Sequence, residues 1–402
     1  MIARFCTYSV LKNLRLADPF LILFLQDLDY SLTAIFSVLG IQHAVTGTLE
    51  LPLGALADRF GRRTSLAVGF LAYATSFALL ATLGPAAEGR LTVAILLFGL
   101  GEALRTGSHK AIILDYLDGT GQTDRATDVI ALTRSFSKGT AAISAVLGGA
   151  VLFATSSYAP LFWVSAVVSV GGFALMWTYP RALEGEQTRS TDPHPPMGRR
   201  VRALVATPGI APLVVQSALF ESQIKLILKY SLQPFLRSAL GSFGLSIVGL
   251  GAIGVGLVEA IRESVGAAGA RLAPRGERAA GGIDPALRAA YLGACACAIG
   301  LALCAGWSWL FAGVALATGL TGLQNARRPL FVAAFNALMD KPQRATSLSL
   351  ESLARTVLVA TLLPGIGWMA DTFGLSTAFA AMATALVAGL LIPVPERAPS
   401  PA

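Results

Sequence analysis

Twelve long apolar stretches divide the chain, and they restrict the possible folds more than any other feature. Each is long enough for a helix to cross a hydrocarbon core, which takes about 20 mostly apolar residues. In hydrocarbon every backbone polar group must be paired within the protein, so only helices and closed barrels span a membrane. The stretches are too long and too uniformly apolar for barrel strands. We therefore predict an all-α membrane protein with transmembrane helices at 7–26, 31–56, 64–84, 90–116, 129–154, 157–179, 209–236, 244–264, 286–305, 307–337, 345–370 and 374–394.

The composition agrees with this class of protein. Of the 402 residues, 54% are hydrophobic and 13% are charged, whereas a soluble domain carries about 25% charged residues. The formal net charge is +8. Basic residues of membrane proteins gather in the loops on the cytoplasmic side. We therefore attribute the positive charge to membrane topology and expect no nucleic-acid partner.

A polar segment at 180–208 separates the first six stretches from the last six. Its prolines and five arginines are typical of a linker. The related sequences DRATDVIALTRS at 124–135 and QRATSLSLESLA at 343–354 open the fifth and the eleventh stretch. Internal repeats of this kind occur in secondary transporters. We predict an N-terminal six-helix bundle at 1–179, a cytoplasmic linker at 180–208 and a C-terminal six-helix bundle at 209–402.

The basic residues are distributed unevenly over the predicted loops. The loops on the side of the N-terminus carry 19 of them, whereas the opposite loops carry only Arg90 and Arg237. This asymmetry predicts a multi-pass protein of the inner (cytoplasmic) membrane with both termini in the cytoplasm. The N-terminus lacks the pattern of a cleaved signal peptide, so we expect the first span to be retained. The 19 residues are Arg4, Lys12, Arg15, Arg59, Arg62, Arg63, Arg125, Arg181, Arg189, Arg199, Arg200, Arg202, Arg271, Arg275, Arg278, Arg288, Lys341, Arg344 and Arg397.

Residues suited to catalysis or metal binding are scarce. The three histidines, His43, His109 and His194, are scattered, and no HExxH motif or CxxC pair is present. The GxxxxGK[ST] loop with which ATP-driven pumps bind phosphate is also missing from the sequence. We therefore expect no enzyme activity, no catalytic residue, no metal and no cofactor.

A charged decapeptide, GALADRFGRR at 54–63, lies between the second and third stretches. Glycine permits tight turns and close helix contacts, and arginine suits an anionic membrane surface. A solvated turn would account for the arginines but not for a carboxylate at this spacing. A carboxylate can cap a helix or pair with a basic residue on a neighbouring helix. The pattern consists of Gly54, Asp58, Arg59, Gly61, Arg62 and Arg63.

This spacing resembles the signature loop of the major facilitator superfamily, G-x-L-a-D-r-x-G-r-[k/r]. The twelve spans, the six-plus-six division and the basic linker extend the resemblance over nearly the whole chain. The segment PGIGWMADTFGLSTAF at 364–379 also looks like the turn between the last two helices of that family. In the second half, the loop RLAPRGERAAGG, which corresponds to the signature loop, lacks the pattern.

The resemblance implies two six-helix bundles around a central cavity that opens alternately to the two sides of the membrane. It implies that Asp58 and its arginines form a gating loop, a cytoplasmic latch that stabilises the outward-open form. It also implies that helices 1, 4, 7 and 10 line the cavity. Because the second half lacks the signature, any such latch is asymmetric.

Charged residues within the predicted spans indicate a structural or functional role, because each raises the free energy of membrane insertion by about 2.5–3.5 kcal/mol at the bilayer centre. Span 4 carries Glu102, Arg105 and His109 at i, i+3 and i+7. In a continuous helix this spacing places all three on one face. We expect these residues to contact the solute. The alternative, that they pair with each other and only hold the helices together, stays open.

Spans 7 and 10 carry the remaining cavity candidates. Glu221, Lys225 and Lys229 recur at i, i+4 and i+8, and Arg327 and Arg328 follow Gln324 and Asn325 in span 10. Cations outnumber anions in these sets, and a cationic cavity favours an anionic solute. The candidate cavity residues are Glu102, Arg105, His109, Glu221, Lys225, Arg327 and Arg328.

Two further carboxylates lie within predicted spans. Glu50 in span 2 and Glu351 in span 11 are candidate proton carriers. An ion pair between Glu351 and Arg355, one turn later, is an equally good interpretation. The antiporter signature of the family's fifth helix, g-x-x-x-G-P-x-x-G-G, is present only in part, since Gly148 and Gly149 fit its end but Ser144 and Ala145 replace Gly-Pro.

These features predict a secondary active transporter that moves a small solute across the lipid bilayer by alternating access. We expect an anionic solute, coupling to protons and a monomeric carrier. Two alternatives stay open. One is a drug or multidrug efflux carrier of the same superfamily. The other is a transporter-like sensor that binds a solute without moving it.

Overall fold

The computed structural model describes residues 1–106, 108–180, 210–337 and 341–392. Within these ranges the chain forms helices and turns without any strand, which confirms the all-α class. The predicted linker lies outside the described residues, apart from Pro180.

Helices occur in all twelve expected spans, and among the described residues eight helical segments are long and apolar enough to cross a membrane. Span 1 is interrupted, spans 8 and 10 coincide with helices that carry several charges, and the helix of span 12 is apolar but shorter. For these four, crossing of the membrane stays a prediction.

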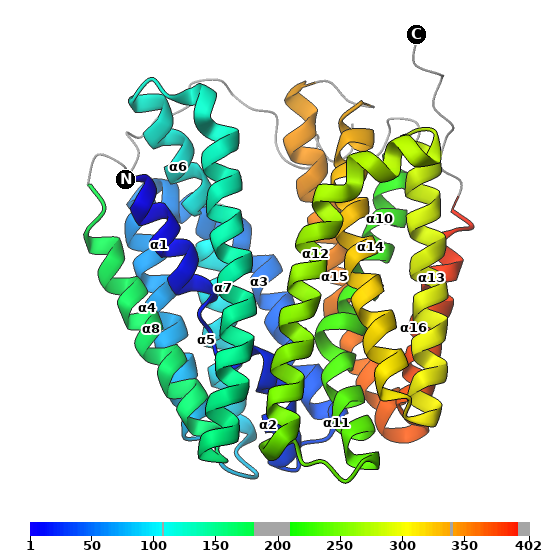
Figure 1. Ribbon diagram of the computed structural model, residues 1–402. Helices are drawn as coiled ribbons and strands as arrows, with labels where there is room; N and C mark the ends of the chain where they lie inside the picture. The colour runs from blue at the N-terminus through cyan, green and yellow to red at the C-terminus, as the bar shows by residue number, and fades with distance from the viewer. Residues whose placement is uncertain (107, 181–209, 338–340, 393–402) are drawn as a thin grey trace. The chain divides into compact units, whose positions relative to one another are not determined.

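The helices that precede the linker are shown in Figure 1 in blue to green. They are α1 (Ile2–Asn13), η1 (Asp18–Phe20), α2 (Leu21–Asp27), α3 (Leu32–Phe60), α4 (Arg62–Ala81), α5 (Glu88–Arg105), α6 (Ser108–Gly119), η2 (Thr123–Arg125), α7 (Ala126–Thr155) and α8 (Ala159–Trp177).

The helices that follow the linker are shown in green to red. They are α10 (Ile210–Lys225), η4 (Leu226–Ser231), α11 (Leu232–Ser242), η5 (Ile247–Gly251), α12 (Ala252–Ala280), α13 (Ile283–Trp307), α14 (Leu310–Ala337), α15 (Lys341–Phe373) and α16 (Leu375–Gly389).

The first predicted span is not one continuous helix. α1 ends at Asn13, and regular structure resumes only at Asp18. A break inside a membrane is tolerated where protein groups satisfy the freed backbone. Here the Gln233 side chain of α11 accepts a hydrogen bond from the backbone N–H of Ile22 at 3.1 Å and donates one to the carbonyl of Asp18 at 3.5 Å.

Spans 4 and 7 also depart from regular helices. α5 ends at Arg105, Thr106 is extended (φ −60°, ψ 126°), and α6 begins at Ser108. In span 7, α10 and α11 are joined by the π-helical turn η4. A π-helical turn is a rare insertion that often marks a functional site.

The chain forms two compact units. One contains the described part of Met1–Ser190 together with Gln233–Ser264 and Leu363–Asp371. The other contains the described part of Thr191–Leu232, Val265–Leu362 and Thr372–Ala402. We refer to them as unit 1 and unit 2.

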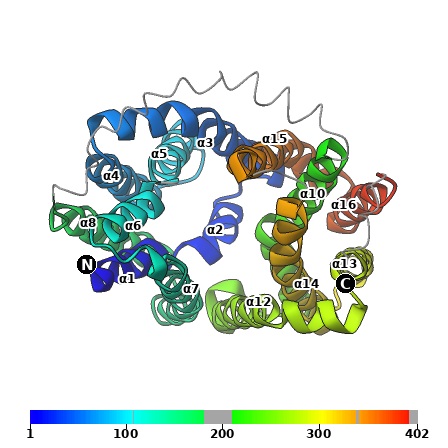
Figure 2. The same cartoon turned by 90° about the horizontal axis from the view of Figure 1, so that it is seen from above.

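In unit 1, α4 packs against both α5 and α8, as Figures 1 and 2 show. The outer face of α8 exposes Trp163, Val167 and Val170. Large apolar side chains at this spacing form one stripe, which is the pattern of a helix that faces lipid.

Close backbone packing joins α7 to the first part of α12, also within unit 1. A Cβ added to Gly149 would lie 2.5 Å from the carbonyl oxygen of Ala252, and one added to Gly256 would lie 2.5 Å from that of Ala145. Each helix thus offers a small-xxx-small pair, the arrangement that lets membrane helices approach closely. Gly149 belongs to the incomplete antiporter signature, so this half of the signature has a packing role.

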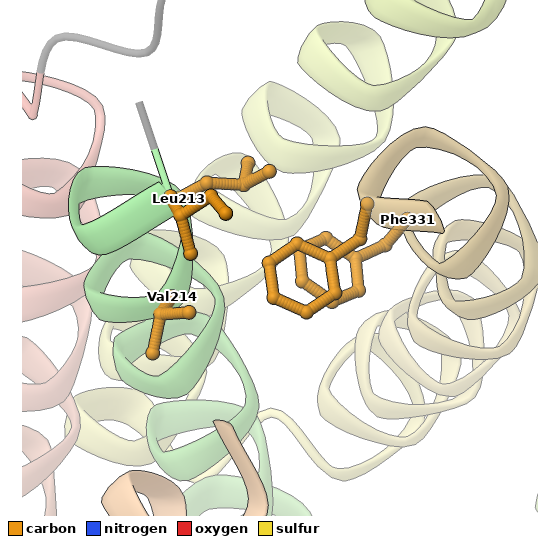
Figure 3. Packing of buried hydrophobic residues seen from close by; sticks show 5 residues of the cluster. Leu213, Val214 and Phe331 are labelled. Atoms are coloured by element: carbon orange, nitrogen blue, oxygen red, sulfur yellow. The ribbon is translucent and has the colours of Figure 1, made fainter. Parts of the chain in front are cut away.

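In unit 2, α13 packs against α14 and α16. A cluster of buried apolar residues joins α10 to α14, and Figure 3 shows Leu213 and Phe331 facing each other within it. Its member Phe331 also lies against the guanidinium groups of Arg327 and Arg328 of α14. Its members are Ile210, Leu213, Val214, Phe331 and Phe335.

Candidate functional site

A group of charged side chains surrounds Glu102 inside unit 1. The Glu102 carboxylate accepts hydrogen bonds from Arg15 Nη1 at 3.1 Å and from the Tyr73 hydroxyl at 2.7 Å. Its other oxygen pairs with Arg105. The side chains of Arg15, Glu102 and Arg105 are all less than a quarter exposed. Two guanidinium groups therefore share one carboxylate, with only the exposed Asp18 at 3.9 Å from Arg15 as a further anion.

The break in span 1 places Arg15 in this group. Arg15 follows the end of α1, and its guanidinium lies 4.1 Å from the centre of the Tyr73 ring and 5.1 Å from that of Phe98. Arginine stacks on aromatic faces in this way. The Arg15 Nη2 atom is buried and has no hydrogen-bond partner among the described residues. It is thus a donor available to an anionic group.

His109 does not share a helical face with Glu102 and Arg105, because α5 ends between them and His109 lies on α6. Its ring stacks on Tyr8 at 3.5 Å between centroids, and Nε2 lies 3.3 Å from the Tyr179 hydroxyl. The expected i, i+7 relation was wrong for His109, since it assumed a continuous helix.

A second charged group lies in unit 2 around Glu221, which is only 4% exposed. Gln324 of α14 donates a hydrogen bond to Glu221 Oε2 at 2.9 Å, and Arg327 Nη1 lies 3.6 Å from Oε1. The Arg327 guanidinium stacks on the Phe220 ring at 4.1 Å. Spans 7 and 10, which were predicted to carry cavity residues, are thus joined by these side chains.

Glu351 is completely buried in unit 2. It accepts two hydrogen bonds from Arg328, at 3.1 and 3.0 Å, and one from Ser217 at 3.3 Å. The expected pairing with Arg355 was wrong, because Arg355 donates to Ser352 instead. The partner comes from α14, which sequence spacing within span 11 could not reveal.

The charged residues of span 7 differ in burial. Glu221 is buried, Lys225 is half-buried and Lys229 is exposed. The π-helical turn η4 begins directly after Lys225.

The gating loop joins α3 to α4. Gly61 has φ +100°, a conformation that favours glycine, and it ends α3 where α4 begins. The predicted tight turn is thus confirmed. A Cβ at Gly54 would meet no described atom within 4 Å, so the close contact expected there is not observed. The side chain of Asp58 lies outside the described part of the structure.

The three arginines of the loop differ in their surroundings. Arg59 is exposed. Arg62 pairs with Asp115 of α6 at 2.5 Å. Arg63 is buried and donates a hydrogen bond to the carbonyl of Tyr179 at 2.9 Å, just beyond the end of α8.

Arg4 makes a similar contact, since it donates a hydrogen bond to the carbonyl of Thr178 at 2.6 Å. Basic side chains near a helix C-terminus satisfy free carbonyls and interact favourably with the helix dipole. Arg63 and Arg4 thus cap α8, whereas the sequence had assigned Arg63 to the gating loop and Arg4 only to the cytoplasmic surface.

The remaining predicted residue, Glu50, is half-buried in α3. Within the described ranges, no three His, Cys, Asp or Glu side chains lie close enough to hold a metal ion.

The geometry matches a known family. The model of the Major Facilitator Superfamily matches residues 1–327, which is most of the chain. The chain belongs to the major facilitator superfamily. It is therefore a multi-pass integral membrane protein with the fold of secondary active transporters, as its signature loop predicted.

Solved structures of superfamily transporters share the fold across nearly the full length. The nucleoside transporter NupG is 13% identical, with a TM-score of 0.75 over 97% of this chain and 96% of that one. A D-xylose-proton symporter is 14% identical, with a TM-score of 0.68 over 97% and 94%. A POT family transporter in complex with a thioalcohol-conjugated peptide is 14% identical, with a TM-score of 0.69 over 97% and 94%. Among curated protein sequences, none matches this chain.

Sequence reasoning missed Arg15 and Tyr73. Arg15 lies inside the span predicted at 7–26, and its position there was a usable signal, yet it was counted among the cytoplasmic charges. The sequence of α4 alone does not reveal the role of Tyr73, because its partners Glu102 and Arg105 come from α5.

Proposed function

We propose that this superfamily member transports a small solute that carries an anionic group, and that Arg15 and Arg105 bind this group. The observation that carries the proposal is the excess of cations around Glu102. Two guanidinium groups share that carboxylate, and Arg15 retains a buried donor without a partner among the described residues. A solute anion would give these guanidinium groups a further partner besides Glu102 and the exposed Asp18.

In the empty carrier Glu102 keeps both cations paired, which avoids an uncompensated buried charge. A solute carboxylate would compete with Glu102 for Arg105. Glu102 would retain Arg15 and the Tyr73 hydroxyl during the exchange. Guanidinium suits this role because it can bind a carboxylate at two points.

We also propose coupling to protons, with Glu351 as the leading carrier and Glu50 as the second. The support is the complete burial of Glu351 beside Arg328, whose side chain is 30% exposed. Protonation of Glu351 would end its ion pair with Arg328. The partly exposed Arg328 side chain could then leave Glu351. A proton could thus change the contact between α14 and α15.

Binding and flux together test the solute proposal. Because a ligand of the native state raises apparent stability by mass action, anionic metabolites should raise the melting temperature of the purified protein. Arg105→Ala should abolish this shift, and Arg105→Lys should restore it only in part. In proteoliposomes the same solute should be taken up, faster with an imposed pH gradient, and Glu351→Gln should lose that acceleration.

Other outcomes would favour the alternatives. Binding without flux would identify a sensor. Binding of cationic drugs with unchanged affinity in Arg105→Ala would favour multidrug efflux. Retained binding of an anionic solute by Arg105→Ala would contradict the assignment of Arg105.

For the topology we propose that both termini and the linker at 180–208 lie in the cytoplasm of a monomeric inner-membrane protein. The support is the uneven distribution of basic residues, although Arg15 and Arg63 are buried and so contribute less to it than a loop charge. A single cysteine placed in the linker should resist an impermeant thiol reagent in intact cells, whereas one at Ala86 should react. Efficient labelling of the linker would refute this orientation.

A further inference from the structure

Part of the gating-loop sequence recurs near the end of the chain, without the arginines of the signature. GALADRFG at 54–61 and GWMADTFG at 367–374 share glycine, alanine, aspartate, phenylalanine and glycine in the same register. Both segments close a long helix, α3 in one case and α15 in the other. The final glycine has φ +100° at Gly61 and +88° at Gly374, and the next helix begins directly after each. The two octapeptides therefore have the same local structure.

Asp371 of the second copy caps the start of α3. Its carboxylate accepts hydrogen bonds from the backbone N–H of Leu32 at 3.1 Å, the backbone N–H of Thr33 at 2.7 Å and the Thr33 hydroxyl at 2.6 Å. The first N–H groups of a helix have no partner within it. Ser31 caps only Ala34, at 3.2 Å. A carboxylate at this place also interacts favourably with the helix dipole.

Gly367 allows the close contact that this cap requires. A Cβ at Gly367 would lie 2.6 Å from the carbonyl oxygen of Leu32 and 2.9 Å from the Cα of Thr33. Gly367 and Asp371 are four residues apart and so lie on one face of α15. The first and fifth residues of the octapeptide thus form one surface that fits the start of α3.

We propose that GWMADTFG is a second latch, which holds the end of α3 opposite to the GALADRFG latch. The first copy forms the end of α3 at Phe60, and the second docks at its beginning, Leu32. A helix of 29 residues places these two points about 42 Å apart. With the alternating access of the proposed function, on which this inference rests, each latch would have to release for the carrier to open at its own end.

A neighbouring ion pair acts at the same end. Arg237 of α11 pairs with Asp27 at the end of α2, and the Tyr158 hydroxyl donates to Asp27 at 2.7 Å. Loss of Asp371 should therefore shift the balance between open and closed forms without abolishing the closed one.

Thiol labelling in purified protein tests the second latch. The probe is Leu32→Cys, since Leu32 is buried beside the cap, in a background with the four native cysteines replaced by alanine. Asp371→Asn replaces one of the two accepting oxygens by an NH2 group, so it should raise the labelling rate of this cysteine by a maleimide about fivefold, as expected for the loss of one hydrogen bond. Gly367→Leu should also raise the rate. Gly365→Leu is the matched control, because a Cβ there would meet no described atom within 4 Å.

Asp58→Asn tests the first latch with the same probe and should have the opposite effect on labelling. Release of the first latch should favour the form that is closed at Leu32, so labelling should fall, and the double variant with Asp371→Asn should return toward the parent rate. Equal labelling in Asp371→Asn and the parent, or an increase in every variant including Gly365→Leu, would overturn the proposal. The assay needs neither solute nor flux. A failure of transport with these labelling shifts intact would thus count against the proposed function alone.

Discussion

Glu102→Gln is expected to produce the largest loss of stability and to abolish transport. The carboxylate holds Arg15 and Arg105, and its loss leaves two guanidinium groups close together without their shared anion. Removal of one partner from a buried ion pair costs about 3–5 kcal/mol. The melting temperature of the purified protein should fall accordingly, and the fraction that elutes as folded monomer should shrink.

Tyr73→Phe is the matched control for this experiment. It removes the 2.7 Å hydrogen bond that the hydroxyl donates to Glu102 and the 3.2 Å one that it accepts from Arg105, but it keeps the aromatic ring against Arg15 and all of the charges. A hydrogen bond to a charged group contributes about 1.5–3 kcal/mol to stability. The melting temperature of this variant should therefore lie between those of the parent and Glu102→Gln. Adding Arg15→Gln to Glu102→Gln should recover part of the stability, because it removes one uncompensated charge. If Glu102→Gln has the same melting temperature as the parent, the Glu102 carboxylate does not stabilise the group that it forms with Arg15 and Arg105.

Gly149→Leu is expected to have the second largest effect. Its side chain would have to occupy the space of the Ala252 carbonyl, which lies 2.5 Å from the position of a Cβ. The clash involves backbone on both sides, so neither helix can relieve it by changing a rotamer. Insertion of extra carbons into a packed core costs about 1–3 kcal/mol, and here α7 and α12 must also separate. Flux should fall with stability.

Gly139→Leu on the same helix provides the comparison. A Cβ at Gly139 would meet no described atom within 4 Å, and the residue is exposed. This variant should melt and transport like the parent. Gly256→Leu should reproduce the defect from the partner helix, because its Cβ would lie 2.5 Å from the Ala145 carbonyl. A parent-like Gly149→Leu would show that the close contact is not needed.

The hydrophobic pattern predicted the helical class and where helices occur, because about 20 consecutive apolar residues are typical of a membrane-spanning helix. The interruptions of the helices could not be predicted from the sequence. The break before Asp18 is sustained by Gln233, which comes from another span, and the turn after Arg105 separates His109 from residues seven positions or fewer away. The spacing of residues in the sequence indicates a shared face only where the helix is continuous. The helices of spans 1 and 4 are interrupted.

The charged residues of the candidate site were found in spans 4, 7 and 10, but their partners were not. Glu351 binds Arg328 of α14 rather than its own neighbour Arg355, and Glu102 binds Arg15 as well as Arg105. Spacing within one helix identifies residues that share a face. It carries no information on which other helix that face meets, and that depends on how the bundle packs.

The position of Arg15 also has a consequence for how the membrane inserts this chain during synthesis. Its carboxylate partner, Glu102, is 87 residues further along. At a synthesis rate of about 5–20 residues per second, the ribosome needs about 4–17 s to supply that partner. A lone arginine at the bilayer centre costs about 2.5–3.5 kcal/mol on insertion scales. We therefore expect the predicted first span to insert stably in the bilayer only after α5 has been synthesised.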